Sequence, residues 1–477
     1  MTTTSYSIAA PRINDLANAV VGADMQVPVR SGGSMRYRFL DNGASTPMLS
    51  CVADVVNDAM RWYSSVHRGS GFKSQLSTHA YEEARRVIER FVGVEDKGTV
   101  AILCRNTTEA LNILAHRIGL DPDDVVITTV MEHHSDLLPW RARAKVVHIG
   151  ADDDGRINFS ELEQKLSEHG DKVRLVALSG ASNVTGVIPP LQELTRLVHR
   201  HGALFAVDAA QLAPHRKIEM GPTGGDESID FLTISGHKMY APMGAGALVA
   251  RKDAFREDAP LLRGGGSVSH VSLEGETWSD TPDRDEAGSP NVIGTVAFGA
   301  AAAALMHIGF DKIVEHERNL TEQTLRGFNS INAVTVYGPK DLPVGQDKLG
   351  VITFNVAGVP FAKVGAILSA EHAIGVRGGR FCAQPYLEHL LGLTPEDVAD
   401  VRHRMLAGDP HNLPGMVRVS FGLYNTTEDV DALLKGVAAI SQGNYGDYEV
   451  DDSNGDYLPV GFKPDLSEYF SYDIGTT

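Results

Sequence analysis

Lys238 stands in an unusual place for a lysine, in the stretch TISGHKMYAPMGAG that spans residues 233–246. It comes directly after a strand-like run, and the loop that follows is built from small residues and one proline. A single loop lysine is usually an exposed surface residue. The alternative is a buried amine: burial lowers its pKa, and the deprotonated nitrogen can then condense with an aldehyde cofactor.

Asp208 ends the apolar run ALFAVD and precedes Lys238 by 30 positions. A carboxylate at a buried strand end is costly unless it is paired. We interpret it either as a helix N-cap or metal ligand, or as the acid that keeps a pyridine nitrogen protonated, so that the ring withdraws electrons. The interval between the two residues predicts one helix and one strand between them.

Further polar residues follow other apolar runs. Thr107 and Thr108 begin a predicted helix, where hydroxyls and free N–H groups can bind a phosphate, although threonine is also an ordinary cap. His133 is interpreted either as a ring that stacks flat on a cofactor or as a capping or core histidine. Asn183 and Gln211 occupy similar positions. Together with the aspartate and the lysine, and in this order, these residues indicate pyridoxal phosphate.

Strand-like and helical patterns alternate through the middle of the chain and must position these side chains. The ranges 47–63 and 78–93 have the apolar spacing of helices. The strand-like runs are GTVAILC, VVITTV, LVALSGASN, ALFAVDAAQ, FLTISGHKM and GALVARK. This alternation predicts a mostly parallel sheet, in which the carboxyl ends of the strands share one edge and bind the ligand.

The patterns divide the chain into four segments. Residues 38–309 are predicted to form a large domain, and residues 310–442 a smaller α+β domain. The N-terminal arm, residues 1–37, is expected to pack on the smaller domain. Residues 443–477 are acidic, aromatic and turn-rich, and we interpret them as a surface strap.

Composition limits the possible functions. The chain has 477 residues and a net charge of −18 at pH 7, which argues against a general nucleic-acid or anionic-membrane role, since both need a basic face. It contains no apolar run long enough to span a membrane, and the N-terminus lacks a signal-peptide pattern. The three cysteines, Cys51, Cys104 and Cys382, form no CxxC pattern. They argue against a disulfide framework or a metal site and fit a reducing cytoplasm.

Ordered motifs along residues 38–442 carry a resemblance to a known family. They are FLDNGAST, SVHRG, NTTEALN, VMEHHSDLLPW, SNVTGVIPP, VDAAQLAPH, ISGHKMYAPMGAG, GGGSVSHVSLE, EAGSPN, VRGGRFCAQP and VRVSFGLYNT. The chain resembles the class V, fold-type I pyridoxal-phosphate enzymes, and within them the cysteine desulfurase and selenocysteine lyase group. This resemblance implies an α/β fold, with a mostly parallel seven-stranded sheet in the large domain and a smaller α+β domain.

The resemblance also implies a role for each cofactor-binding residue. Lys238 would bind the cofactor aldehyde, Asp208 would pair with the pyridinium nitrogen, and Gln211 would bond to the phenolic oxygen. His133 would stack on the ring and carry protons. The phosphate would be bound by Thr107, Thr108, Ser235, His237 and, across a dimer interface, Ser289. Serine stands there in place of the family's usual threonine and keeps the hydroxyl.

The implied substrate is a small amino acid, cysteine or a derivative of it. Asn183 and Arg418 would hold its carboxylate, Arg418 through a bidentate fork that lysine cannot copy. The resemblance implies a homodimer, in which His67, Arg68 and Ser289 reach the partner's site. A sulfur-acceptor protein or a reductant would then take the sulfur onward.

Cys382 decides the reaction that the resemblance implies. In RGGRFCAQP it stands where the desulfurase group carries its sulfur-accepting cysteine. Only a thiolate is nucleophilic enough, and Arg377 and Arg380 flank the residue with positive charge. The alternative interpretation is a small buried apolar residue. Cys51 and Cys104, on a helix face and at a strand end, are interpreted as structural. The predicted reaction removes sulfur from L-cysteine, giving alanine and a persulfide on Cys382.

Two departures from the family pattern keep other functions open. Arg380 and Phe381 stand where the family has histidines, and TPEDVADVRHRMLAGD (394–409) is predicted to be an inserted helix. A second hypothesis is a carbon–sulfur lyase, or another class V enzyme, acting on a cysteine derivative or a specialised-metabolite amino acid. A third is a catalytically idle homologue that serves as a binding scaffold, although the intact cofactor lysine and aspartate argue against it.

Overall fold

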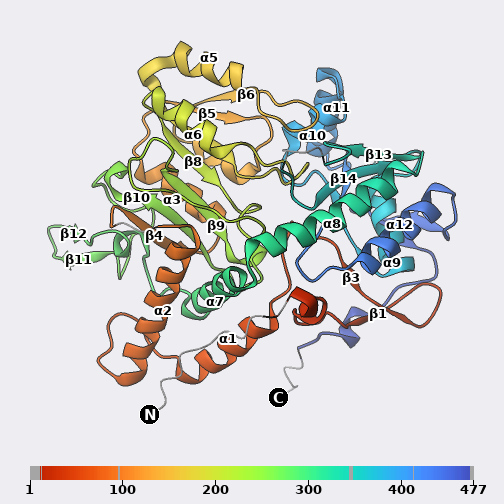
Figure 1. Ribbon diagram of the computed structural model, residues 1–477, viewed down its shortest axis with the longest axis horizontal. Coiled ribbons are helices and arrows are strands. Elements are labelled where there is room, and N and C mark those ends of the chain that lie inside the picture. Colours follow the sequence, from red (N-terminus) through yellow and green to blue (C-terminus); the bar gives the residue numbers. More distant parts are fainter. Residues whose placement is uncertain (1–10, 12, 95–96, 343–346, 412, 473–477) are drawn as a thin grey trace.

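A computed structural model of the chain describes residues 11, 13–94, 97–342, 347–411 and 413–472. The first ten residues of the predicted N-terminal arm, residue 12 and the last five residues of the extension lie outside this description. Two domains are joined by the long helices α7 (Val292–Ile308) and α8 (Phe310–Asn329), which bend by 81° at Gly309. Figure 1 shows α8 leading from the large domain into the smaller one.

A seven-stranded sheet forms the centre of the large domain. In spatial order its strands are β4 (Thr99–Cys104), β10 (Gly246–Arg251), β9 (Phe231–Ser235), β8 (Leu204–Asp208), β7 (Val173–Ser179), β5 (Val125–Thr129) and β6 (Lys145–Ile149). All pairs are parallel except the two that β10 makes with β4 and β9. The predicted mostly parallel α/β sheet is therefore confirmed.

Helices cover both faces of this sheet. Val125 and Ile127 of β5 belong to one apolar core and Val126 to the other, because successive strand residues point to opposite faces. The face with Val126 is covered by α3 (Thr107–Arg117). The opposite core is built with α1 (Ser50–Trp62), α2 (Phe72–Phe91), α5 (Phe159–His169), α6 (Leu191–Arg200) and α7. Figure 1 shows α1, α2 and α7 close together at one end of the large domain.

The smaller domain contains an antiparallel four-stranded sheet. Its strands, in spatial order, are β13 (Val334–Tyr337), β14 (Val351–Val356), β17 (Met416–Ser420) and β16 (Arg377–Gly379). Helices α8, α9 (Phe361–His372) and α12 (Thr427–Ser441) supply its apolar core. Between β16 and β17 the chain forms α10 (Gln384–Leu390) and α11 (Pro395–Leu406). The predicted inserted helix is thus present, and a capping box of Thr394 and Asp397 begins it.

Two sequence predictions need correction. No helix lies between β8 and β9: residues 209–230 are turns and irregular chain. Pro214, Gly221 and Pro222 explain this, since proline lacks the amide donor that a helix needs and glycine is a poor helix former. The second correction concerns α2, which begins at Phe72 and not near residue 78. Its first two turns carry mostly polar residues, so the helical spacing of apolar residues is not visible there in the sequence.

The chain ends contact both domains. Leu16 of η1 (Ile13–Asn18) packs in the core of the large domain. Farther along, the Arg30 N–H donates to Ala370 O of α9 at 2.8 Å. The C-terminal extension forms a hairpin of β18 (Tyr448–Val450) and β19 (Tyr457–Pro459), whose Tyr448 Oη lies 3.0 Å from Glu371 Oε1 of α9. The domain limits given by the sequence stay a prediction.

In the described part of the chain, no single helix is long and apolar enough to cross a membrane. Helices α7 and α8 reach the required length and apolar character only when they are taken together, and they are bent at Gly309.

Candidate active site

One pocket at the carboxyl ends of the large-domain strands gathers most of the predicted site residues. It encloses a cavity of about 210 Å³. The predicted residues that line it are Thr107, Thr108, His133, Asn183, Asp208, Gln211, Ser235, His237, Lys238, Cys382 and Arg418. His67, Arg68 and Ser289 do not line it in this single chain. The parallel strands and the β16–α10 segment therefore meet at one site, as open α/β sheets place their ligands.

Lys238 lies in the short helix η4 (Gly236–Lys238), directly after β9. Loss of solvation lowers its pKa to about 8, although the carboxylate of Asp208 acts in the opposite direction. A Cβ added to Gly246 would lie 2.8 Å from the Asn106 Cα, so only glycine lets the backbone pass here. The small residues after the lysine thus allow close packing around a partly desolvated amine.

Asp208 is the last residue of β8, the strand next to β9, and is buried. Its Oδ1 accepts a hydrogen bond from Ala210 N at 2.9 Å. Burial raises the pKa of Asp208, while this hydrogen bond and Lys238 favour the ionised form. Gln211 is held nearby, since its Nε2 donates to Gly43 O at 2.7 Å. The pocket therefore holds a buried carboxylate that interacts electrostatically with the lysine amine, and such a carboxylate suits the protonated nitrogen of a heterocycle.

Hydroxyl groups surround the first turn of α3. Asn106 caps the helix by accepting from Glu109 N at 3.0 Å. Ser235 Oγ accepts from Thr107 N at 2.8 Å, and Thr108 Oγ1 lies 2.7 Å from Ser135 Oγ. A helix N-terminus with several hydroxyls favours an anion such as a phosphate. Ser135 was missed by sequence reasoning, although it stands in the VMEHHSD motif.

His133 faces the same pocket from the segment after β5. Its Nδ1 accepts from Ser135 N at 3.1 Å. Burial, with a smaller contribution from Lys238, lowers the pKa of His133 to about 3, so the imidazole is neutral at physiological pH. A neutral ring can lie against an aromatic cofactor and accept a proton.

Glu132, which sequence reasoning missed, anchors the chain segment directly before His133. It is 2% exposed and accepts from Ser179 N at 2.7 Å and from Thr129 Oγ1 at 2.6 Å. These bonds tie the carboxyl end of β5 to that of β7. Burial raises the pKa of Glu132 to about 7. The only feature of the sequence that could have indicated Glu132 as a site residue is its position in VMEHHSD, between a strand and His133.

Arg418 reaches the pocket from β17 of the smaller domain and is 3% exposed. Its Nη1 donates to Asn183 O at 3.0 Å and its Nη2 to Asp41 Oδ1 at 3.0 Å. Within the described part of the chain, its buried Nε has no hydrogen-bond partner. Asp41 was missed, although it lies in FLDNGAST, because no local pattern predicts its ion partner. Arg418 thus offers an unused donor to an anion in the pocket.

Cys382 is exposed and lies in a left-handed backbone segment. Phe381 has φ 52° and Cys382 has φ 53°. Two hydrogen bonds hold this segment: Asn183 Nδ2 donates to Phe381 O at 2.7 Å, and His134 N donates to Cys382 O at 2.7 Å. The thiol shares its pocket with the basic side chains of Lys238 and Arg418.

The two arginines near Cys382 behave differently. Arg377 lines the pocket and is more than half exposed, with its Nη1 3.8 Å from Asp41 Oδ2. Arg380 is engaged outside the pocket, because its Nε donates to Pro414 O at 3.3 Å and its Nη1 lies 2.6 Å from Met405 Sδ of α11. The inserted helix therefore anchors the loop that carries Cys382.

The model of the family described as Aminotransferase class-V matches residues 38–433. This chain belongs to that family. It is 36% identical over 408 residues to a probable cysteine desulfurase of Halalkalibacterium halodurans, covering 84% of this chain and 92% of the relative. It is 35% identical over 427 residues to one of Halobacterium salinarum, covering 87% and 95%.

Solved structures agree with this membership of the class V family. An apo cysteine desulfurase of Thermococcus onnurineus NA1 matches with a TM-score of 0.74 and 33% identity, over 85% of this chain and 95% of that one. The cysteine desulfurase CsdA of Escherichia coli, in an S-sulfonic acid form, matches with a TM-score of 0.69 and 30% identity, over 84% and 93%. The fold-type I architecture predicted from the motifs is confirmed.

The remaining predicted residues lie outside the pocket of this class V chain. The His67 ring packs edge-on against Tyr81, with 5.3 Å between ring centroids, and its Nε2 lies 3.2 Å from Glu82 Oε1. Ser289 is exposed just before α7. Their role, with that of Arg68, at a partner's site stays a prediction. Cys104 is partly buried at the end of β4, and burial raises the pKa of its thiol.

Proposed function

We propose that this class V enzyme is a pyridoxal-phosphate-dependent cysteine desulfurase, which removes the sulfur of L-cysteine and releases alanine. The observation that carries the proposal is the exposed thiol of Cys382, which lines the same pocket as Lys238, Asp208 and Arg418. A β-elimination enzyme needs the amine and the carboxylate but no thiol. The names of the relatives at 30–36% identity support the same activity.

The pocket fits pyridoxal phosphate, the cofactor of the class V family. The partly desolvated Lys238 suits its aldehyde, and Asp208 suits the ring nitrogen. The hydroxyls of Thr108 and Ser235 at the start of α3, with His237, suit its phosphate. When bound, this cofactor supplies an electron sink that stabilises negative charge on the α-carbon of an amino acid.

The chain's own residues then handle the substrate. The unused Nε of Arg418 and the side chain of Asn183 would orient the substrate carboxylate. Lys238, with a pKa of about 8, is near the range in which an amine can both accept and return the α-proton. The neutral imidazole of His133 would lie against the cofactor ring and accept a proton. These groups fix the substrate sulfur toward Cys382.

Sulfur transfer is a nucleophilic attack by the Cys382 thiolate on the substrate sulfur. The new bond joins the two sulfurs, the bond between carbon and sulfur breaks, and the carbon keeps the bonding pair. Protonation of that carbon gives alanine and leaves a persulfide on Cys382. Lys238 and Arg418 line the same pocket as the Cys382 sulfur. Cys382 is exposed, so a sulfur-acceptor protein or a small reductant can reach the persulfide.

The proposal includes a homodimer in a reducing, cytoplasmic environment. An apolar groove between α1, α2 and α7 is lined by the exposed Trp62 and Tyr63, and the exposed Phe72 packs edge-on against Trp62. A second copy would cover this groove and bring His67 and Ser289 toward the neighbouring pocket. The three cysteines are free thiols, which fits a reducing compartment.

A carbon–sulfur lyase acting on a cysteine derivative remains the second candidate. The observation that favours it is the inserted helix α11, whose Met405 contacts Arg380 two positions before Cys382. A lyase would release pyruvate and ammonia and would not need Cys382. A desulfurase would release alanine and would lose activity without the thiol.

The test compares products from the parent enzyme and from Cys382→Ser, with alanine, pyruvate and sulfide measured together. A desulfurase gives alanine from L-cysteine, and the serine variant falls by at least about 10²-fold, or about 2.7 kcal/mol in barrier. Cys51→Ser, on α1, is the matched control and should keep parental rates. Equal turnover by Cys382→Ser and the parent would replace the desulfurase with the lyase.

A further inference from the structure

The loop of residues 183–186 lies between the two domains. Ser182 of the large domain accepts hydrogen bonds from its amides, and its carbonyls face the smaller domain. Each of its backbone carbonyls accepts a hydrogen bond from that domain. In order along the loop, the donors are Arg418 Nη1 (3.0 Å), Thr353 Oγ1 (2.6 Å), Lys348 Nζ and Leu349 N (2.8 Å). Because the four bonds are consecutive, the position of this loop depends on the smaller domain.

The same loop holds the backbone of the proposed sulfur acceptor. Asn183 Nδ2 donates to Phe381 O at 2.7 Å, and Phe381 and Cys382 both have φ near 50°. A non-glycine residue in the left-handed region costs about 1–2 kcal/mol. Such a conformation persists only where its surroundings enforce it. A shift of loop 183–186 would therefore be passed to Cys382 through Asn183.

Lys348 is an unusual member of this set, because it is a lysine with 6% exposure. Its Nζ donates to two backbone carbonyls, those of Thr185 and Val351. Burial lowers its pKa to about 7, while the buried carboxylate of Glu317 favours the charged form. A hydrogen bond from a charged donor is about twice as strong as one between neutral groups. The ammonium form of Lys348 therefore makes a stronger hydrogen bond to the Thr185 carbonyl than a neutral donor would.

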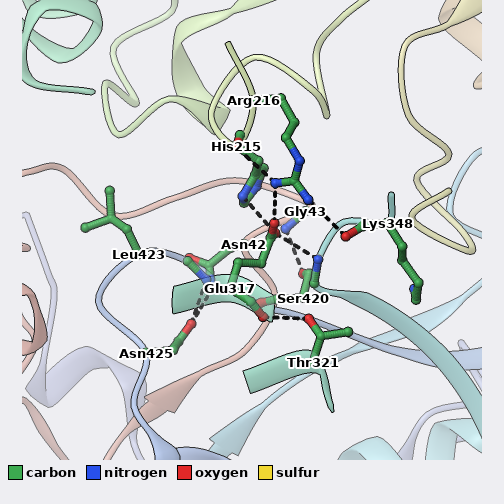
Figure 2. Close-up of polar contacts among 12 residues, drawn as sticks. Asn42, Gly43, His215, Arg216, Glu317, Thr321, Lys348, Ser420, Leu423 and Asn425 are labelled. Atoms are coloured by element: carbon green, nitrogen blue, oxygen red, sulfur yellow. Dashed lines mark hydrogen bonds and ion pairs between the residues drawn. The ribbon is translucent and has the colours of Figure 1, made fainter. Parts of the chain in front are cut away.

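A partly buried ion cluster holds the backbone of Lys348 from the other side. Arg216 pairs with Asp347 through two 2.8 Å contacts, and its Nη2 also donates to Lys348 O at 3.0 Å. Glu317 of α8 accepts from Gly350 N at 2.8 Å and pairs with His215 and Arg216. Figure 2 shows Arg216 and His215 converging on Glu317, with Lys348 beside them. Segment 347–350 is therefore held by hydrogen bonds to this cluster on one side and to loop 183–186 on the other.

We propose that Lys348 is a positioning residue for sulfur transfer: by holding the Thr185 carbonyl it fixes loop 183–186 and, through Asn183, the backbone that presents Cys382. The effect on sulfur transfer rests on the proposed function, whereas the effect on the position of Cys382 does not. Removal of the lysine donors leaves the Thr185 and Val351 carbonyls unpaired. The backbone at Phe381 and Cys382 is then no longer held in one conformation, and the position of the thiol in the pocket changes.

The test uses the holoenzyme and the variants Lys348→Met, Lys348→Arg and Lys340→Met. Methionine keeps the length and removes the donors, arginine restores donors and charge, and Lys340 is an exposed control in the same part of the domain. Three quantities are measured: the rate of Cys382 alkylation by iodoacetamide, read by peptide mapping; kcat and KM for alanine formation; and the visible cofactor spectrum.

Lys348→Met should keep the cofactor spectrum and lower kcat about tenfold or more, since small misplacements of reacting groups are costly. The alkylation rate of Cys382 should change at least about threefold, because the backbone that presents the thiol is no longer held in one conformation. Lys348→Arg should restore both rates, and Lys340→Met should match the parent.

Parental alkylation and a parental kcat in Lys348→Met would overturn the proposal, and so would a rise in KM alone. If the methionine variant does not yield folded holoenzyme, Lys348→Gln is judged by the same two rates. If the parent forms no alanine, the proposed function fails, but the alkylation rates still decide the role of Lys348.

Discussion

Glu317 offers a quantitative test of the interface between the two domains. It lies on α8 and is 4% exposed. Its Oε1 is 2.9 Å from His215 Nδ1 and 2.8 Å from Gly350 N, and its Oε2 is 2.6 Å from Arg216 Nη1. Glu317→Gln keeps the shape and removes the negative charge between His215 and Arg216, so that Asp347 alone still compensates the charge of Arg216.

The size of the effect follows from the pKa of Glu317. Burial raises this pKa, but the charges and hydrogen bonds of His215 and Arg216 outweigh burial and bring it from 4.5 to about 2. That difference corresponds to about 3 kcal/mol at about 1.4 kcal/mol per pKa unit. Because the folded-state pKa is depressed, this stability is fully present above pH 4.5 and is lost as the pH falls toward 2.

Urea unfolding, followed by far-ultraviolet circular dichroism at pH 7 and pH 3.5, measures the effect. At pH 7, Glu317→Gln should be less stable than the parent by about 3 kcal/mol. At pH 3.5, this deficit should be smaller by about 1.4 kcal/mol. Glu315→Gln, at an exposed position on the same helix, should stay within about 0.5 kcal/mol of the parent. A Glu317→Gln variant as stable as the parent at pH 7, or a deficit that grows on acidification, would refute the reasoning.

Three further predictions concern the site. Borohydride reduction of the holoenzyme should place the pyridoxyl group on Lys238, and Lys238→Ala should lose turnover while keeping weak cofactor binding; a label on another lysine would contradict the assignment. Since burial lowers the pKa of His133 to about 3, its ring should stay neutral from pH 5 to 8 in a nitrogen NMR titration, and a midpoint near 6.5 would contradict this. Light scattering should give the mass of a homodimer, whose interface we expect to bury on the order of 2,000 Å² or more. A fully active monomer would exclude the homodimer.

Sequence reasoning found the residues whose position follows from the order of strands. Lys238, Asp208 and His133 each come directly after an apolar run, and parallel strands bring such residues to one edge. The inserted helix was also visible, because its threonine cap, proline and acidic first turn are local signals. These features depend on short-range chemistry, which the sequence carries directly.

Features that depend on distant partners were not visible in the sequence. Asp41 pairs with Arg418 across 377 positions, and Lys348 reaches Thr185 across 163. No local pattern marks such a pair, because burial and the partner are set only when the domains pack. The wrong helix between β8 and β9 has a different origin: the length of the interval fitted a helix, but its prolines and glycines prevented one.

Mass spectrometry of Cys382 after a single turnover tests the central claim most directly. The holoenzyme is mixed with one equivalent of L-cysteine carrying heavy sulfur, quenched with an alkylating agent and digested. The account predicts one heavy sulfur atom added to the peptide that contains Cys382, together with one equivalent of alanine. Heavy sulfide in solution with pyruvate, and an unmodified Cys382 peptide, would contradict it.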